Sequence, residues 1–276
     1  MILGAITNSW AEQLMDTDLP RLVERARRRG AQHVELRQSY LGQYETGAGE
    51  DWRPVTEKMV RLVRTFPLLT FNLAIAYPCL TTPPEPRSPV FQASLEAARA
   101  LGSSGNPRLR MVDPARFDSP WETAEDLPRE ALGVADLARE SARQGVSLFI
   151  ENSGQPIRSM HLLVREARAR LAPEEAGCLG LCVDAANSLR CDPSSDPVAE
   201  MEGVPGDAVL MVHFKQTRDG KPHPSVGEGD LDFRRQVAVM RAKGYDGPVV
   251  LEIPPGPGVF DSFVESVQYL EGLEAA

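Results

Sequence analysis

The sequence predicts one α/β domain over residues 1–276, folded as a closed (β/α)8 TIM barrel. Short apolar runs alternate with helical patterns, which implies parallel strands joined by crossover helices. Eight such units follow one another at intervals of roughly 30 to 40 residues, as a closed barrel requires. The first strand lacks the glycine-rich phosphate turn of an open nucleotide-binding sheet, and no linker divides the chain.

Each unit can be assigned to a segment of the chain. The expected strands are 2–7, 31–37, 68–75, 107–112, 146–151, 178–184, 208–214 and 248–253. The expected helices are 18–29, 54–65, 90–101, 156–171, 198–202, a segment that begins at 230, and 261–273. Ser119 to Glu122 has the form of a capping box with proline at the first helical position, which predicts a long helical region, continuous or broken, that ends at Gly145.

Composition and charge exclude several classes of function. The formal net charge of −9 argues against a nucleic-acid partner, because phosphate binding needs clustered Lys and Arg. No apolar run approaches the roughly 18 residues that span a bilayer, and the first residues lack the basic region of a signal peptide. The four cysteines form no CxxC pair, so we expect reduced thiols in a cytoplasmic protein. Association into a homo-oligomer stays open.

Four expected strands carry a metal-binding side chain near their ends. These residues are Glu151, Asp184, His213 and Glu252, in the last four strands. Barrel enzymes place their chemistry at the rim formed by the C-terminal ends of the strands. Two glutamates, an aspartate and a histidine suit a divalent cation of hard-to-borderline character, so we expect Mn²⁺, Mg²⁺, Co²⁺ or Zn²⁺.

The alternation of side chains along a strand places these four residues inside the barrel. Side chains two positions apart share a face, so Glu151 lies on the same face as Phe149. The other three follow the same rule, and the opposite face of each strand is aliphatic, as the surface that packs against helices should be. A single carboxylate at a strand end is more often a cap or an ion pair. Four successive strands with matching alternation predict one shared site.

Five short motifs between residues 146 and 254 resemble those of the xylose isomerase-like TIM barrel superfamily: E-N, V-D-A-A-N, V-H-F-K, G-E-G-D-L-D-F and L-E. That group contains sugar and sugar-phosphate isomerases and epimerases, inosose and dehydroshikimate dehydratases, and AP endonucleases. The resemblance implies that Glu151, Asp184, His213 and Glu252 are metal ligands. It also implies that Glu151 and Glu252 are the catalytic pair that moves protons in ketose 3-epimerases.

The ligand set predicts a type of chemistry more firmly than a product. A cation chelated by a carbonyl and its neighbouring hydroxyl stabilises an enediolate, and carboxylates remove and return the alpha proton. We expect a metal-dependent isomerase or epimerase of a sugar or similar hydroxy-ketone. The alternative is a lyase that dehydrates a keto-polyol such as an inosose or dehydroshikimate. A sugar- or metal-binding barrel without turnover is the third interpretation.

The resemblance is incomplete at two positions. Asn187 stands where the epimerases carry histidine, and Asp219, beside Arg218, stands where they carry arginine. Close similarity to the ketose 3-epimerases is therefore not expected. The chain has only four histidines, whereas the AP endonucleases need more for a three-metal cluster and also need a basic groove.

Further residues are candidates for contact with a sugar or polyol substrate. They are Glu35, Asn72, Asn187, Lys215 and Arg218. Three of them also have a purely structural interpretation. Glu35 can form a buried ion pair with Arg37, Asn72 can be a hydrogen-bonded amide of the core, and Lys215 can form a salt bridge at the rim. For Arg110 a surface position is favoured over contact with an anionic substrate group, and His33 is expected at the rim.

Overall fold

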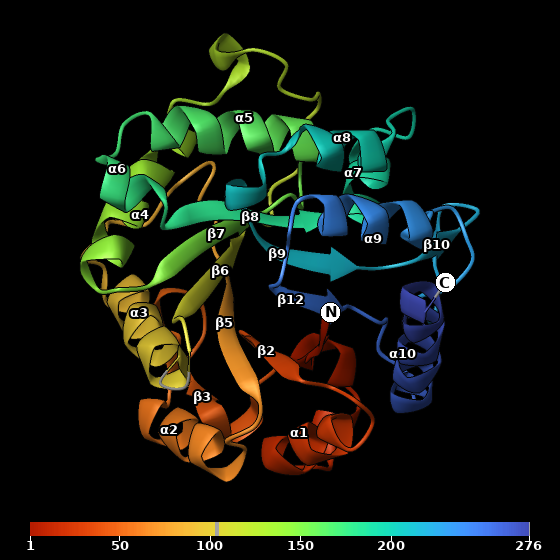
Figure 1. Cartoon of the computed structure of the whole chain (residues 1–276). Coiled ribbons are helices and arrows are strands. Elements are labelled where there is room, and N and C mark those ends of the chain that lie inside the picture. Colours follow the sequence, from red (N-terminus) through yellow and green to blue (C-terminus); the bar gives the residue numbers. More distant parts are fainter. Residues whose placement is uncertain (103–104, 276) are drawn as a thin grey trace.

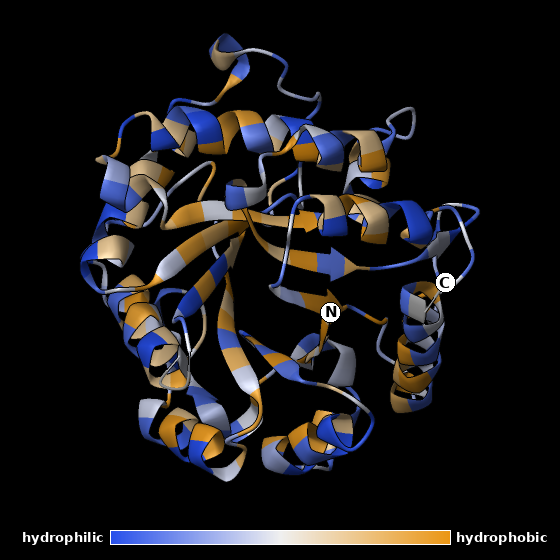
Figure 2. Ribbon diagram, viewed as in Figure 1, coloured by the Kyte–Doolittle hydropathy of each residue, from blue (hydrophilic) through white to orange (hydrophobic). Residues whose placement is uncertain are grey.

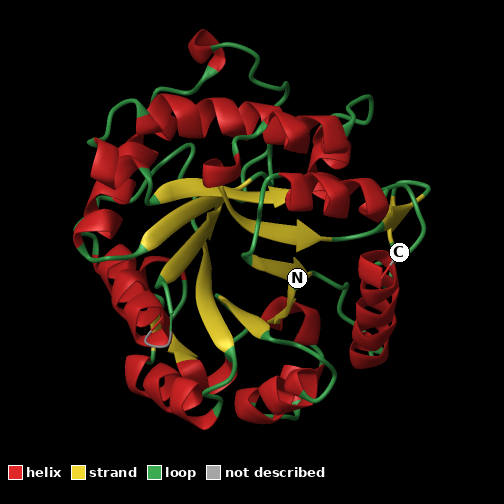
Figure 3. Cartoon of the chain, viewed as in Figure 1, coloured by secondary structure: helices red, strands yellow, loops and turns green. Residues whose placement is uncertain are grey.

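The computed structural model describes residues 1–102 and 105–275, and eight of its strands close into a parallel barrel (Figures 1 and 3). The strands of the barrel are β1 (Ile2–Ile6), β2 (His33–Arg37), β5 (Thr70–Ala76), β6 (Arg108–Val112), β7 (Ser147–Glu151), β8 (Leu179–Asp184), β9 (Val209–Phe214) and β12 (Pro248–Leu251). All eight coincide with expected segments, so the predicted (β/α)8 barrel is confirmed.

The order of the strands around the barrel follows the chain. It runs β1, β2, β5, β6, β7, β8, β9 and β12, and β12 then pairs with β1. The register aligns Asp184 of β8 with His213 of β9, and His213 with Val250 of β12. Because Glu252 lies two residues beyond Val250, its side chain lies on the same face and close to His213.

Helices form a ring around the strands (Figure 3). They are α1 (Leu19–Arg27), α2 (Thr56–Thr65), α3 (Pro89–Leu101), α4 (Val134–Arg143), α5 (Ile157–Arg168), α6 (Pro173–Ala176), α7 (Ala185–Cys191), α8 (Pro197–Gly203), α9 (Phe233–Ala242) and α10 (Val259–Ala275). In Figure 2 the ring helices carry both hydrophobic and hydrophilic residues, and the strands are hydrophobic with hydrophilic segments, for example in β2 and β6. Two small hairpins lie outside the barrel, β3 (Glu45–Thr46) with β4 (Arg53–Pro54) and β10 (Thr217–Arg218) with β11 (Lys221–Pro222).

Local signals explain where helices begin and end. Asp18 caps α1 by accepting a hydrogen bond from the backbone N–H of Arg21, and Pro20 occupies the first turn. Gly30 follows the helix with a φ of +101°, a conformation that side chains with a Cβ rarely adopt. The chain can therefore turn sharply from α1 into β2.

The interior of the barrel is apolar on one side. Ile6, Phe149, Cys182, Met211 and Val250 form a separate buried cluster there, apart from the larger core that joins the strands to the helices. The last four of these residues lie two positions before the four expected ligands. The predicted alternation along β7, β8, β9 and β12 is therefore correct.

The other side of the barrel interior is polar. His33, Glu35, Asn72 and Arg110 project inward from β2, β5 and β6, and none of them is more than 1% exposed. They are joined by hydrogen bonds, from His33 Nε2 to Asn72 Oδ1 at 2.7 Å and from Asn72 Nδ2 to Glu35 Oε1 at 2.8 Å. The expectations of a surface position for Arg110 and a rim position for His33 are wrong. Both residues lie on the inward face of a strand.

The helical region expected from Ser119 to Gly145 is broken, and its first part is not α-helix. Only Val134–Arg143 is α-helix, and the preceding segment holds short 3-10 turns, Ala124–Asp126 and Glu130–Gly133. The capping box is formed later than expected, by Thr123 and Asp126. The side chain of Gln155, just before α5, accepts a hydrogen bond from the backbone N–H of Trp121, and Ser159 of α5 donates to the Trp121 carbonyl. These bonds hold the segment against α5 in place of helical hydrogen bonds.

No helix in the described part of the chain combines the length and the apolar character that crossing a membrane would require. The four cysteines are free thiols in this structure, as their spacing predicts.

Candidate metal centre

Four side chains converge at the C-terminal rim of the barrel. Glu151 ends β7, Asp184 ends β8, His213 lies one residue before the end of β9, and Glu252 directly follows β12. One ligand atom from each residue can be chosen so that all four atoms lie within 4.8 Å of one another. The strand pattern predicts that these residues share one site, and the geometry brings them together.

Hydrogen bonds from the rim hold the carboxylates in place. Asp184 caps α7, and its Oδ1 accepts the backbone N–H of Asn187 at 3.0 Å. The side chain of Asn187 donates to Glu151 Oε1 at 2.9 Å. On the other side of the site, Asn8 donates to Glu252 Oε1 at 2.9 Å. Because each of these bonds engages one oxygen, Asp184 Oδ2 and Glu252 Oε2 remain directed toward the centre.

The two ring nitrogens of His213 face different groups. Nδ1 lies 3.1 Å from Glu252 Oε2 and 4.0 Å from Glu151 Oε1, so it faces the ligand cluster. Nε2 points into the barrel, 3.1 Å from Glu35 Oε2, without a well-aligned hydrogen bond. Nδ1 is therefore the nitrogen placed to bind a cation.

The ammonium group of Lys215 lies among the ligands. Its Nζ is 2.9 Å from Asp184 Oδ2, 2.9 Å from Glu252 Oε2 and 3.7 Å from Glu151 Oε1. Three carboxylates thus surround one positive charge. The ammonium stands where a cation would be held, and the donor set fits a metal ion, since oxygen ligands with one histidine nitrogen are typical of divalent cations.

Mutual interactions keep the site ionised. Burial disfavours the charged form of Glu252, but Lys215 and His213 outweigh it and hold the pKa of Glu252 well below its usual range. For Glu151, burial is outweighed by Arg110, Lys215 and His213, which lower its pKa. Burial likewise opposes the charge on Lys215, yet the three carboxylates raise its pKa above the ordinary value. Glu151 and Glu252 are therefore anions, the form that binds metals and accepts protons.

The structure separates the five predicted substrate contacts. Asn187 and Lys215 lie at the site, in contact with its carboxylates. Arg218 is exposed on the β10–β11 hairpin and donates to the backbone carbonyl of Glu228 at 3.0 Å. It is therefore not brought into the cluster.

Glu35 and Asn72 lie beneath the site, fully buried. The expected partner of Glu35 is also corrected: the pair is made with Arg110 at 2.7 Å, and not with Arg37. Because they are buried, they can contact the ligands and the residues around them, as Glu35 does with His213. Their burial does not place them in the path of a substrate.

Sequence reasoning missed Arg110 as part of the site. Its Nη1 donates to Glu151 Oε2, so this arginine contacts a predicted ligand directly. The alternation of side chains along β6 could have located it. Leu109 and Met111 face the helices, so Arg110 between them faces the interior of the barrel. The general rarity of buried arginine obscured it.

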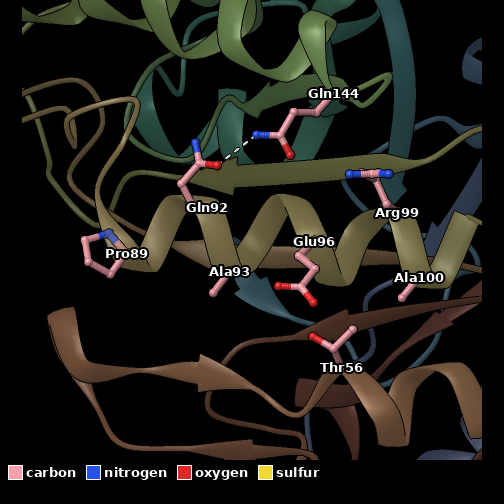
Figure 4. A pocket seen from close by; sticks show the side chains of 8 residues that line it. All are labelled: Thr56, Pro89, Gln92, Ala93, Glu96, Arg99, Ala100 and Gln144. Atoms are coloured by element: carbon pink, nitrogen blue, oxygen red, sulfur yellow. Dashed lines mark hydrogen bonds between the residues drawn. The ribbon is translucent and has the colours of Figure 1, made fainter.

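A hollow elsewhere on the surface shares no residue with the metal centre. It lies along α3 and is lined by Gln92, Glu96 and Arg99, with Gln144 donating to Gln92 at 2.9 Å (Figure 4). Its polar groups do not converge on a vacant point, so we assign the candidate site to the barrel rim.

A family model described as xylose isomerase-like TIM barrel matches residues 23–272. Among solved structures, the chain is similar to an IolI protein with a bound zinc atom, at 15% identity and a TM-score of 0.69, covering 100% of this chain and 97% of that one. It is similar to an L-ribulose 3-epimerase, at 14% identity and a TM-score of 0.70, covering 99% and 94%.

A third similar structure is the probable 3-DHS dehydratase AsbF from Bacillus anthracis, at 15% identity and a TM-score of 0.69, covering 98% of this chain and 99% of that one. Identities this low establish a shared fold. No curated protein sequence matches the chain.

Proposed function

The chain belongs to the xylose isomerase-like TIM barrel family, and on this premise we propose that it is a divalent-metal-dependent isomerase or epimerase of a sugar or a similar hydroxy-ketone. One observation carries the proposal: Glu151, Asp184, His213 and Glu252 meet within 4.8 Å, with a positive charge already held between the carboxylates. The similar structures named for a zinc atom and for an epimerase support it.

The four converging residues would hold the metal, through Nδ1 of His213 and one oxygen of each carboxylate. A bound divalent cation would supply Lewis-acid polarisation of a carbonyl and its neighbouring hydroxyl. Asn187 and Lys215 stand beside the carboxylates and are placed to bind substrate hydroxyl groups.

Glu151 and Glu252 are placed to move the proton next to the carbonyl. They come from β7 and β12, on opposite sides of the pair formed by β8 and β9, so one carboxylate can take a proton from one face and the other can return it. Their lowered pKa values keep both of them ionised at neutral pH, and the ionised form is the one that can accept a proton. The Glu252 side chain is 20% exposed and that of Glu151 is 5% exposed, so Glu252 is the more accessible base.

A lyase that dehydrates a keto-polyol is the second candidate. Asn187 stands where the epimerases carry histidine and donates to Glu151, and Arg218 donates to the backbone carbonyl of Glu228. Neither residue takes the part that histidine or arginine plays in the epimerase pattern. The similar AsbF structure also favours this alternative. The two reactions share the first proton transfer and differ in whether water is then lost.

The first test is the metal content of the purified full chain beside Asp184→Ala. We expect about one divalent ion per chain, lost in the variant and retained in the control Asp207→Ala, which removes an exposed carboxylate paired with Arg168. Absence of metal from the wild-type protein, even after addition of Mn²⁺ or Zn²⁺, would refute the proposal.

The second test distinguishes the reactions. Ketoses and keto-polyols are incubated with the metal-loaded protein in deuterated water, and products are read by mass. Deuterium gained without loss of water indicates isomerisation or epimerisation, whereas loss of one water indicates the lyase. Glu252→Gln should abolish the exchange while metal stays bound through the other three ligands. Exchange at the wild-type rate in this variant would remove Glu252 from the mechanism.

A further inference from the structure

A charged pair is buried inside the barrel directly beneath the metal centre. Glu35 of β2 and Arg110 of β6 are 0% and 1% exposed, and they contact each other at 2.7 Å. A buried ion pair contributes little net stability, because removing both charges from water costs about as much as their attraction returns. Its presence under a site of four ligands therefore suggests a role other than stability.

Glu35 is fixed in one orientation. Its Oε1 accepts hydrogen bonds from Asn72 Nδ2 at 2.8 Å and from Arg110 Nε at 3.0 Å, and its Oε2 accepts from Arg110 Nη2 at 2.7 Å. Asn72 is held in turn by His33, whose Nε2 lies 2.7 Å from its Oδ1. These neighbours come from β5, β6 and β2 itself, so the carboxylate has no freedom to rotate.

The fixed carboxylate faces the back of a metal ligand. Glu35 Oε2 lies 3.1 Å from Nε2 of His213, whereas Nδ1 of the same ring faces Glu151 and Glu252. Metal binding requires the neutral ring, and in that form a carboxylate 3.1 Å from Nε2 favours the tautomer with the proton on Nε2, although the two groups are not aligned as a hydrogen bond. That tautomer leaves the lone pair of Nδ1 directed at the metal position.

Arg110 reaches a second ligand. Its Nε and Nη2 engage Glu35, and its Nη1 donates to Glu151 Oε2. Glu151 Oε1 is thereby directed toward the centre, where Asn187 Nδ2 lies at 2.9 Å. One arginine thus joins the carboxylate behind His213 to the carboxylate that ends β7.

We propose that Glu35 and Arg110 are positioning residues of the metal centre: Glu35 sets the tautomer and ring orientation of His213, and Arg110 aims Glu151. The proposal rests on the metal site of the proposed function. It assigns Glu35 to the support of His213, and not to the substrate contact that the sequence suggested. Neither residue touches substrate in this scheme.

Binding of Co²⁺ to the full chain, after removal of other metals, tests the proposal. Affinity is measured by competition with a chelator, and the visible absorption of bound Co²⁺ reports the geometry of its ligands. Glu35→Gln keeps the shape of the side chain but loses its charge. We expect Co²⁺ affinity to fall by about 10- to 100-fold, as for other partners of metal-binding histidines, and the visible spectrum to change.

A second variant guards against a folding defect in the first. Glu35→Leu with Arg110→Met removes both charges together, an exchange that buried pairs tolerate, and should show the same loss of affinity and a changed spectrum. The matched control is Arg168→Met. Arg168 donates to the Leu179 carbonyl at the start of β8 and pairs with Asp207, away from the ligands. It should lower stability and leave Co²⁺ affinity and spectrum unchanged.

The possible failures are distinguishable. If the wild-type protein binds no Co²⁺, Zn²⁺ or Mn²⁺, the proposed function itself fails. If the wild type binds Co²⁺ and the Glu35 and Arg110 variants retain its affinity and spectrum, only the positioning role is refuted. A loss of thermal stability with unchanged affinity and spectrum refutes the positioning role as well, because a purely structural pair would behave in that way.

Discussion

Replacement of Lys215 by methionine tests whether its ammonium group neutralises the carboxylates of the site when no metal is bound. Methionine keeps most of the aliphatic stem and removes the ammonium, which lies 2.9 Å from Asp184 Oδ2, 2.9 Å from Glu252 Oε2 and 3.7 Å from Glu151 Oε1. In the metal-free protein, Lys215→Met leaves three carboxylates close together with one fewer counter-charge. We therefore expect a loss of stability that depends on the absence of metal.

The size of the effect follows from burial. Removing one partner of a fully buried ion pair costs roughly 3–5 kcal/mol. The side chain of Lys215 is 23% exposed, and His213 and Arg110 remain as nearby positive groups, so we expect about 2–3 kcal/mol. With a divalent ion bound, the ion supplies the missing charge, and the loss should fall below about 1 kcal/mol.

Thermodynamic linkage turns the same difference into a binding prediction. A variant that is destabilised only in its metal-free form must bind the metal more tightly by the same free energy. The expected gain is roughly 10- to 100-fold in affinity, since about 1.4 kcal/mol corresponds to a factor of ten.

Urea unfolding in the presence of a chelator and with saturating Mn²⁺ or Zn²⁺ measures both quantities. The control is Lys243→Met, which removes a half-buried lysine at the end of α9 that donates to the Glu202 carbonyl at 2.8 Å. That control should lose equal stability with and without metal. If Lys215→Met behaves like the control, or binds metal no more tightly than the wild type, the assignment of Lys215 as an internal counter-ion is refuted.

Three further predictions follow from single contacts. His213→Ala should lower metal occupancy measured by elemental analysis, and full occupancy would remove His213 from the ligand set. Burial lowers the pKa of His33 to about 4 in the folded state, whereas the same side chain titrates at about 6.5 in the unfolded chain. Between these two pH values only the unfolded chain is protonated at His33, so the folded state loses stability as the pH falls. Between pH 7 and 4.5, His33→Gln should therefore lose about 2 kcal/mol less stability than the wild type in urea unfolding, and equal losses would contradict the depressed pKa. Asp18→Ala removes the cap of α1 and should cost about 1 kcal/mol in the same assay, whereas an unchanged midpoint would show that the cap contributes nothing.

The sequence was most informative where alternation along a strand was combined with residue chemistry. Phe149 and Glu151 on one face of β7, repeated in the next three strands, were enough to locate the ligand cluster. The same rule applied to β6 would have placed Arg110 inside the barrel. It failed there because a buried arginine is expected only when its partner is known, and Glu35 lies 75 residues away along the chain.

Contacts between distant segments account for the remaining differences. The region after Ser119 has a helix-start signal, yet the backbone of Trp121 is hydrogen-bonded to Gln155, just before α5, and to Ser159 within it, and these contacts override the local preference. The position of the Lys215 ammonium between three carboxylates also depends on strands that meet only after the barrel closes. The spacing of residues along a single sequence does not reveal that an ammonium and three carboxylates from different strands will lie in contact.

The four ligands occupy consecutive strands, β7, β8, β9 and β12, so the metal centre belongs to one side of the rim. The loops after β1, β2, β5 and β6 surround the remainder of the opening and contribute none of the four. Apart from Asn8, which donates to Glu252, we therefore expect substitutions in those loops, including the proline-rich stretch 78–88, to leave the four ligands in place. A directed-evolution library confined to them would explore new substrates while every member keeps the same reactive centre.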